Sequence, residues 1–260
     1  MSFAPPARPL PPAPASAADL ANISVPQWQA VLAAEPHAAA AWVQAAAQLG
    51  HAEAQAVMGQ WLLDGHGSER DPQQALHWFL RAAHLGHAMA ANMAGRCHEQ
   101  GWGTVIDPEK AAHWYRQALR LAELPQAQYN LANLMAAGQG VPRDQRQAFA
   151  LYSQAAGQGY AKAYAKLGRY HEDGEVVPRD AATAFDCYRR GAEGGDFRGQ
   201  FSYAGMLAAL GRIDEAVGWL EKVIEGATPR YLRQAGELLL QAPDARVRAV
   251  GERMRARAGD

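Results

Sequence analysis

The sequence predicts an all-α fold, a right-handed superhelical solenoid of stacked antiparallel helix pairs. The main observation is a 36-residue motif, His51 to Gly86, that recurs along the sequence. Four features stay in phase through four units: a loop glycine, an aspartate, an alanine and an aromatic ring. They are Gly65, Gly101, Gly138 and Gly174; Asp71, Asp107, Asp144 and Asp180; Ala75, Ala111, Ala148 and Ala184; and Phe79, Tyr115, Tyr152 and Tyr188. Self-similarity at this period is typical of helical repeat proteins.

Each unit predicts two helices joined by a glycine loop. No proline interrupts the Ala-rich stretch 52–63, and Gly65 and Gly67 follow it, as expected where a helix ends in a residue of positive φ. Asp71 is expected to accept hydrogen bonds from the free amides of the second helix, 72–85, which has proline in its first turn. Small residues let the two helices approach, and aromatic rings fill the remaining space. One such hairpin cannot bury its own apolar face, so the units must stack.

The third and fourth units carry most of a known repeat pattern. The matching residues are Gly138, Gly140, Val141, Asp144, Ala148, Tyr152, Ala155, Ala156 and Gly159, then Ala163, Leu167, Gly168, Gly174, Val177, Asp180, Ala184, Tyr188, Ala192 and Gly195. This pattern resembles the Sel-one-like repeat family, a relative of the tetratricopeptide repeat, over residues 39–227. The usual tyrosine of that family is replaced by Leu62, His98, Met135 and His171. The resemblance implies a helix-pair solenoid that serves as an assembly, signalling or regulatory scaffold.

The ends of the sequence depart from the repeat. Six prolines in the first residues favour an extended tail, which is either a solubilising leader or a docking strand for a proline-binding groove. Trp42 lies one period before Trp78, which indicates a degenerate first unit. The expected divisions are a flexible tail, 1–19; an N-terminal capping helix pair, 20–50; five repeats, 51–86, 87–122, 123–159, 160–195 and the tetratricopeptide-like 196–227; and C-terminal capping helices, 228–260.

The last expected helix, 243–258, combines an apolar stripe with a basic surface. Val247, Val250 and Met254 form the stripe and predict a docked cap. Five arginines lie on its other faces, either as a solvated cap surface or as a site for an anionic partner.

Composition argues against several classes of function. A net charge of −1 creates no long-range field that would recruit nucleic acid or a membrane, and the apolar runs are far shorter than the ~20 residues of a membrane span. Cys97 and Cys187 share rows with bulky core residues, so both are expected to be small core residues. Two such cysteines fit a reducing compartment, and we expect a cytoplasmic location.

Searches for catalytic and metal sites are negative. The G-x-G loops recur between helices with no preceding strand, so they are turns and not phosphate loops. The nine histidines are the one oddity, but equivalent positions in stacked helices lie about 8–10 Å apart, too far to share one metal ion. We therefore expect a solvated surface for them, no catalytic residue, no metal and no cofactor. The alternative is a histidine-dependent metal-binding sensor or an enzyme accessory protein.

The remaining expectation is recognition of another protein or peptide. In related solenoids the first helix of each pair lines a concave groove, and the resemblance places six polar side chains there: Gln60, Arg96, Asn130, Asn133, Lys166 and Arg169. Amides and cations in this arrangement suit an acidic segment or the C-terminus of a polypeptide. Alternatively, Glu99 and Glu172 neutralise Arg96 and Arg169 within their own helices. The predicted function is a non-catalytic adaptor, with a toxin-neutralising immunity protein as an alternative.

Overall fold

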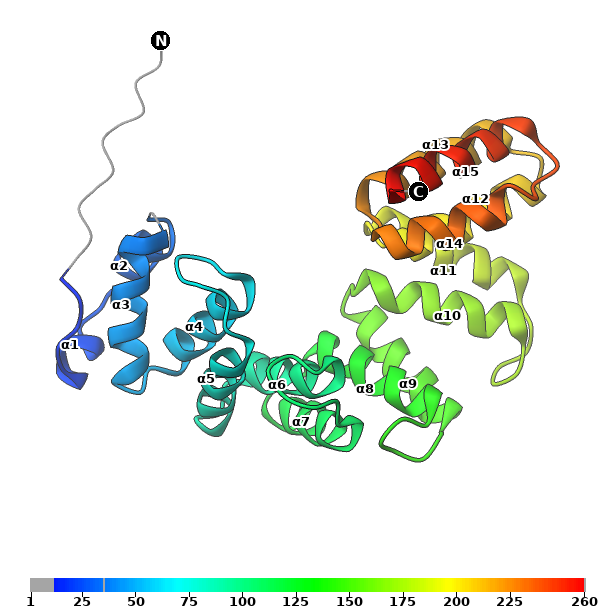
Figure 1. Cartoon of the computed structure of the whole chain (residues 1–260). Helices are drawn as coiled ribbons and strands as arrows, with labels where there is room; N and C mark the ends of the chain where they lie inside the picture. Colours follow the sequence, from blue (N-terminus) through cyan, green and yellow to red (C-terminus); the bar gives the residue numbers. More distant parts are fainter. Residues whose placement is uncertain (1–11, 35, 260) are drawn as a thin grey trace, which may run out of the picture. The chain divides into compact units, whose positions relative to one another are not determined.

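The computed structural model describes residues 12–34 and 36–259, and its regular secondary structure is helical throughout (Figure 1). No strand occurs in these ranges. The protein divides into two compact units, Met1–Arg143 and Asp144–Asp260. In both units consecutive helices pack in pairs. The expected all-α fold of stacked helix pairs is therefore confirmed.

The first unit contains eight helices among its described residues. They are α1 (Ala17–Ala21), α2 (Val25–Leu32), α3 (Pro36–Gln48), α4 (Ala52–Asp64), α5 (Pro72–His84), α6 (Ala88–Gln100), α7 (Pro108–Leu121) and α8 (Pro125–Ala137). Helices α4 and α5 form one pair and α6 and α7 the next, while α5 also packs on α6. The second helix of each pair thus contacts both its partner and the first helix of the following repeat, as a solenoid requires.

Helix α1 crosses the boundary that the sequence predicts between tail and cap at residue 19. It begins at Ala17 because Ser16 and Asp19 form a capping box: the Asp19 amide donates to Ser16 Oγ at 3.2 Å, and the Ser16 amide donates to Asp19 Oδ2 at 2.8 Å. Nearby, Trp42 Nε1 donates to the Pro12 carbonyl oxygen at 3.2 Å. The rest of the predicted tail, residues 1–11, lies outside the described residues.

The glycine loops perform the two tasks that the repeat requires. Gly65 and Gly101 end α4 and α6 in the left-handed conformation, with φ of 76° and 73°. Gly103, at φ 70°, touches the preceding repeat so closely that a Cβ atom would overlap the carbonyl group of Pro72. Asp71 then caps α5 by accepting from the Gln74 amide at 2.9 Å. The expected helix ends are confirmed, and the second glycine marks the contact between repeats.

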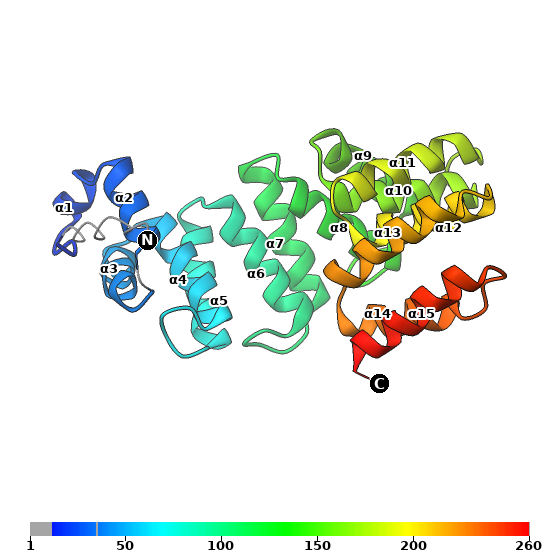
Figure 2. The same cartoon turned by 90° about the horizontal axis from the view of Figure 1, so that it is seen from above.

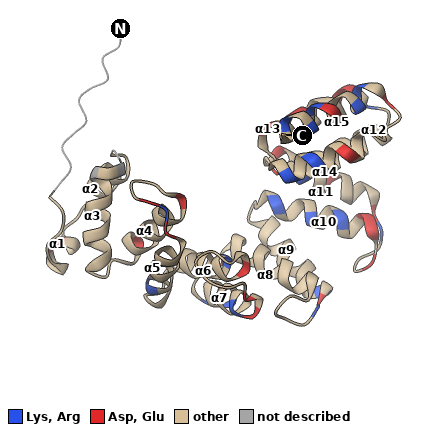
Figure 3. Cartoon of the chain, in the orientation of Figure 1, with Lys and Arg blue, Asp and Glu red and all other residues tan. Residues whose placement is uncertain are grey.

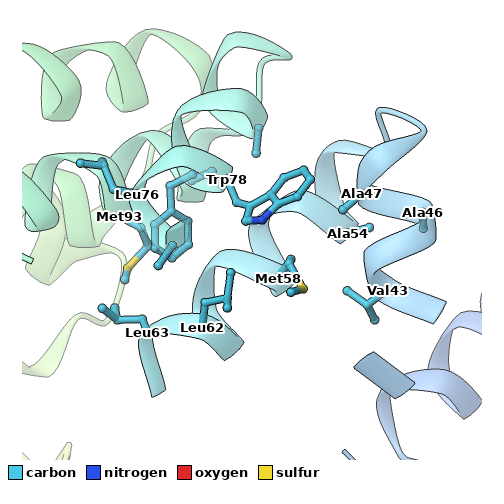
Figure 4. Packing of buried hydrophobic residues seen from close by; sticks show 14 of the residues in the cluster. Val43, Ala46, Ala47, Ala54, Met58, Leu62, Leu63, Leu76, Trp78 and Met93 are labelled. Atoms are coloured by element: carbon cyan, nitrogen blue, oxygen red, sulfur yellow. The ribbon is translucent and has the colours of Figure 1, made fainter. Parts of the chain in front are cut away.

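Small residues and rings interlock inside each pair. A methyl group on Gly59 would lie 2.8 Å from the Phe79 ring, and one on Gly95 would lie 2.6 Å from the Tyr115 ring. Around them, apolar side chains from α3 to α6 form a continuous core. Figure 4 shows part of this core, which includes Val43, Met58, Leu62, Leu63, Leu76, Trp78 and Met93. Close helix approach therefore depends on glycine facing an aromatic ring.

The second unit contains seven helices among its described residues. They are α9 (Gln145–Gly157), α10 (Ala161–Asp173), α11 (Ala181–Glu193), α12 (Phe197–Ala209), α13 (Ile213–Gly226), α14 (Pro229–Leu239) and α15 (Ala245–Ala258). The closest pairs are α10 with α11, α12 with α13, and α14 with α15 (Figure 2). Helices α12 and α13 lie within the segment 196–227, for which a short fifth unit is expected, and α14 and α15 follow them.

Helix α15 is docked through the predicted apolar stripe, because Val247, Val250 and Met254 are buried. Three of its five arginines bind acidic residues of the same unit, and Figure 3 shows the charges mixed on these helices. The pairs are Arg246 with Asp214 at 2.7 Å, Arg253 with Glu221, and Arg255 with Glu237 at 3.2 Å. These contacts favour the cap-surface interpretation over an anionic partner.

Candidate functional site

The polar side chains predicted to line a groove in the first unit are engaged within the protein itself. Gln60 Nε2 donates to Asp64 Oδ2 at 2.7 Å, and Asn130 Nδ2 donates to Asn92 Oδ1 at 3.0 Å. Asn92 is only 2% exposed, so the latter pair links α6 to α8 from inside. Asn133 also takes part in an interaction. All three predicted amide side chains therefore already have a partner within the protein.

Arg96 is held by neighbouring side chains as well. Its guanidinium carbon lies 4.8 Å from the centre of the Trp102 ring, a cation–π contact. Glu99 does not pair with Arg96 among the described residues; its carboxylate accepts a hydrogen bond from the Tyr115 hydroxyl. The alternative of neutralisation by Glu99 is thus not what the geometry shows.

The second unit brings four cations to one pocket. Lys162, Lys166 and Arg169 extend from α10, and Arg198 extends from the first turn of α12. The pocket has a volume of about 540 Å³ and reaches Tyr231 on α14. We call it the cationic pocket. It contains two of the predicted groove residues, Lys166 and Arg169, and two that the sequence analysis did not select.

Three of these cations lack an ion-pair partner among the residues that the structure describes: Lys162, Lys166 and Arg198. The fourth, Arg169, pairs with Asp173 at 3.2 Å, although its side chain is 77% exposed. Within the described residues Glu172 does not pair with Arg169; it accepts a hydrogen bond from the Tyr188 hydroxyl at 2.6 Å. Arg198 lies over the Phe197 and Tyr231 rings, with 4.5 and 5.7 Å between its guanidinium carbon and the ring centres.

The electrostatics of the cationic pocket favour an added anion. Burial lowers the pKa of the Lys166 ammonium, and the charges of Arg198 and Arg169 lower it further. Asp196, which is 4% exposed, caps α12 by accepting from the Gly199 amide at 2.9 Å. Burial raises the pKa of this carboxyl, while that hydrogen bond and the surrounding cations oppose the shift. Glu172 and Asp173 also line the pocket, so together with Asp196 three carboxylates face the four cations and one positive charge stays uncompensated. A further carboxylate would compensate it.

Lys162 and Arg198 are not among the six side chains that the resemblance places in the groove, but the repeat register contains a signal for them. A third row lies six residues before the small residue at the helix crossing, and it reads Glu53, Met89, Gln126, Lys162 and Arg198. Two consecutive cations in that row are a signal that the repeat register alone could have revealed.

The histidines and cysteines serve the fold. His51 and His87 cap α4 and α6, accepting from the amides of Ala54 at 3.2 Å and Ala90 at 3.0 Å. His98 is only 7% exposed, so the expectation of a solvated surface is wrong for it. Nowhere in residues 12–34 and 36–259 do three or more potential ligands gather for a metal ion.

The two thiols are unpaired and differ in burial. Cys97 is fully buried, and burial raises the pKa of its thiol to about 11. Cys187 is half-buried, and burial raises the pKa of its thiol too.

None of the helices within the described ranges is long and apolar enough to cross a membrane.

Comparison with known proteins identifies the repeat. The Sel1 repeat model matches more than half of the sequence, at residues 32–51, 52–87, 88–122, 125–160 and 161–196. The match includes part of the expected N-terminal cap and omits the expected fifth unit, 196–227. Four of the five segments agree with the expected repeats to within two residues.

Solved structures share the fold. A Sel1 repeat protein from Oxalobacter formigenes has 24% identity and a TM-score of 0.72 over 87% of this chain and 96% of that one. The protective antigen c5321 of uropathogenic Escherichia coli has 26% identity and a TM-score of 0.63 over 86% of this chain and 49% of that one. The immunity protein Pa5087 from Pseudomonas aeruginosa has 16% identity and a TM-score of 0.54 over 80% of this chain and 81% of that one. Sel1 repeats generally form scaffolds for protein–protein interaction. This chain belongs to the Sel1 repeat family.

Proposed function

We propose that this Sel1 repeat protein is a non-catalytic scaffold that binds an acidic segment, or the C-terminal carboxylate, of a partner protein in the cationic pocket. The observation that carries the proposal is the convergence of Lys162, Lys166 and Arg198 on one concavity without an ion-pair partner among the described residues. Lys166 is half-buried, whereas Lys162 and Arg198 are exposed. An unpaired, half-buried cation destabilises a fold, so a binding role accounts for the presence of Lys166.

A carboxylate fits the cationic pocket chemically. Hydrogen bonds between ammonium or guanidinium groups and carboxylates are about twice as strong as neutral ones, and arginine can bind both carboxylate oxygens at once. The Arg198 guanidinium lies over the Phe197 and Tyr231 rings, and arginine combines such stacking with in-plane N–H donors that suit a carboxylate. The bound segment would add the negative charge that Lys166 and Arg198 lack.

The other predicted functions gain no specific support. The immunity protein shares the fold at 16% identity, which carries no information about function. At the starts of α4 and α6, the Nδ1 atoms of His51 and His87 accept hydrogen bonds from backbone amides and so act as helix caps. A cytoplasmic location for the scaffold stays a prediction from the cysteines.

A random 12-residue phage-displayed peptide library tests the proposal with the full-length protein as bait. Peptides recovered on the wild type are expected to be enriched in Asp and Glu or to require a free C-terminal carboxylate. The pocket variant changes three cations together: Lys162→Gln, Lys166→Gln and Arg198→Gln. It should bind the recovered peptide at least about tenfold more weakly, since one charged hydrogen bond contributes about 1.5–3 kcal/mol.

A matched control removes the same charge elsewhere in the second unit. It carries Arg179→Gln, Lys222→Gln and Arg257→Gln, at exposed residues that do not line the cationic pocket. This control should bind the peptide like the wild type. Recovery of peptides that show neither acidic enrichment nor a need for a free C-terminal carboxylate, or equal weakening by both variants, would contradict the proposed function.

A further inference from the structure

A second pocket, of about 690 Å³, adjoins the cationic pocket along α12. Its walls include Phe185 of α11 and Phe201 and Met206 of α12. We call it the apolar pocket. Glu172, Tyr188 and Ser202 line both pockets, so the two concavities share one wall.

The apolar pocket is open because the fifth repeat has glycine at a position where the other repeats have a larger side chain. The row that follows the small residue at each helix crossing reads Gln60, Arg96, Asn133, Arg169 and Gly205. Only the fifth repeat has glycine there. Gly205 lies on the wall of the apolar pocket, and a Cβ atom added to it would meet nothing within 4 Å. Any larger residue at this position would project into space that is now vacant.

We propose that the partner segment carries an apolar side chain that occupies the apolar pocket while its acidic group occupies the cationic pocket. This inference rests on the proposed function and specifies the partner further. The occupant is identified by charge complementarity on one side and by apolar walls on the other, since burial of a leucine-sized or aromatic side chain against Phe185, Phe201 and Met206 is favourable. The acidic group is expected on the side away from Glu172.

The helix geometry sets the spacing between these two groups. Arg198 and Met206 are eight residues apart on the same helix, and a rise of about 1.5 Å per residue separates them by roughly 12 Å along α12. An extended peptide advances about 3.3–3.6 Å per residue. The apolar side chain should therefore lie about three to four positions from the acidic residue.

The same random 12-residue phage library tests this inference with two variants of the full-length protein. Gly205→Leu fills the apolar pocket. Gly218→Leu is the matched control, because Gly218 lies within α13, is exposed and has nothing within 4 Å of an added Cβ atom. Wild type and control should recover peptides with an apolar residue about three to four positions from Asp or Glu. The Gly205→Leu protein should recover acidic peptides without that apolar preference.

Measured affinities of the recovered peptides then test whether the apolar pocket binds the apolar side chain. Replacing the apolar residue of a recovered peptide by serine should weaken binding to the wild type about tenfold, and to Gly205→Leu hardly at all. Acidic peptides with no apolar preference on the wild type, or the same preference on Gly205→Leu, would overturn this inference and leave the proposed function standing. Loss of acidic enrichment itself would overturn both. A wild-type dimer that Gly205→Leu dissociates would assign the apolar pocket to a second copy of the protein and would also overturn the inference.

Discussion

Replacement of Gly95 by alanine tests the interlocking of small residues and rings that holds each helix pair together. The added methyl group would lie 2.6 Å from Cε1 of Tyr115 and 3.2 Å from the Ala111 carbonyl oxygen. Carbon atoms in contact are normally about 3.5–4.0 Å apart. The Tyr115 ring must therefore move by about 1 Å, or α6 must move away from α7.

The size of the destabilisation depends on how far the Tyr115 ring can move. Tyr115 is fully buried, and its hydroxyl is fixed by a hydrogen bond to Glu99, so the ring has little room to yield. Overpacking of a core costs about 1–3 kcal/mol, and alanine is better than glycine in a helix by about 1 kcal/mol. With the strain near the upper end of its range, Gly95→Ala should lower the free energy of unfolding by about 1–2 kcal/mol.

Urea unfolding followed by tryptophan fluorescence is the appropriate assay. Six of the seven tryptophans precede residue 143 and so report on the unit that contains Gly95. Gly218→Ala is the control, since its methyl group would meet nothing within 4 Å. The unfolding of this control is followed by circular dichroism. Its free energy of unfolding should rise by about 0.5–1 kcal/mol, because alanine has a higher helix propensity than glycine. The two glycine-to-alanine changes should therefore have opposite signs.

A second substitution shows whether the ring is the cause. The fifth repeat has Ala204 and Leu220, both buried, where this repeat has Gly95 and Tyr115. Tyr115→Leu should be destabilising alone, because it leaves a cavity, and less so in the Gly95→Ala background. Unchanged or increased stability of Gly95→Ala, or strict additivity of the two changes, would refute the packing argument.

Two further predictions concern titratable side chains. Burial, and secondarily the charge of Lys110, lowers the pKa of His98 below its ordinary value of 6.5. The unfolded state therefore binds a proton at this side chain more readily than the folded state. The contribution of His98 to the free energy of unfolding should be complete above about pH 6.5 and decrease as pH falls. The wild type should have a lower urea midpoint at pH 5.5 than at pH 7.5, and this difference should be smaller in His98→Leu, which copies Leu62 of the preceding repeat. An equal difference in both proteins would show that other groups cause the pH dependence. Lys166→Met should raise the midpoint at pH 7.5, because it removes a half-buried charge beside Arg198, whereas a lower midpoint would show that Lys166 has a stabilising partner.

The repeat could be predicted closely because its signals are local. The helix expected over 52–63 runs from Ala52 to Asp64, since Gly65 fixes its end through the left-handed conformation. The helices after Asp71 and Asp107 begin where an acidic cap and a proline dictate. These features depend on a few neighbouring residues, and their recurrence in phase removes the ambiguity that each would have alone.

The candidate site was harder to predict because pairing depends on the stacking of repeats. The sequence places Asn130 and Asn92 in different rows, 38 residues apart, and only the packed helices bring their amides to 3.0 Å. The same holds for Arg198, whose place beside Lys166 depends on how α12 packs on α10. Helix α1 was missed for a different reason. Its capping box at Ser16 is a local signal that the surrounding prolines outweighed in the sequence analysis.

Nuclear magnetic resonance of the lysine side chains tests the central claim most directly. The protein has only four lysines, so reductive ¹³C-methylation yields a resolved probe at each. Lys162 and Lys166 line the cationic pocket, whereas Lys110 pairs with Asp107 at 3.0 Å and Lys222 lies over the Trp219 ring. Titration with an acidic peptide recovered from the library should shift the resonances of Lys162 and Lys166 and leave those of Lys110 and Lys222 in place. Peptide binding that leaves Lys162 and Lys166 unshifted, or shifts all four alike, would contradict the account.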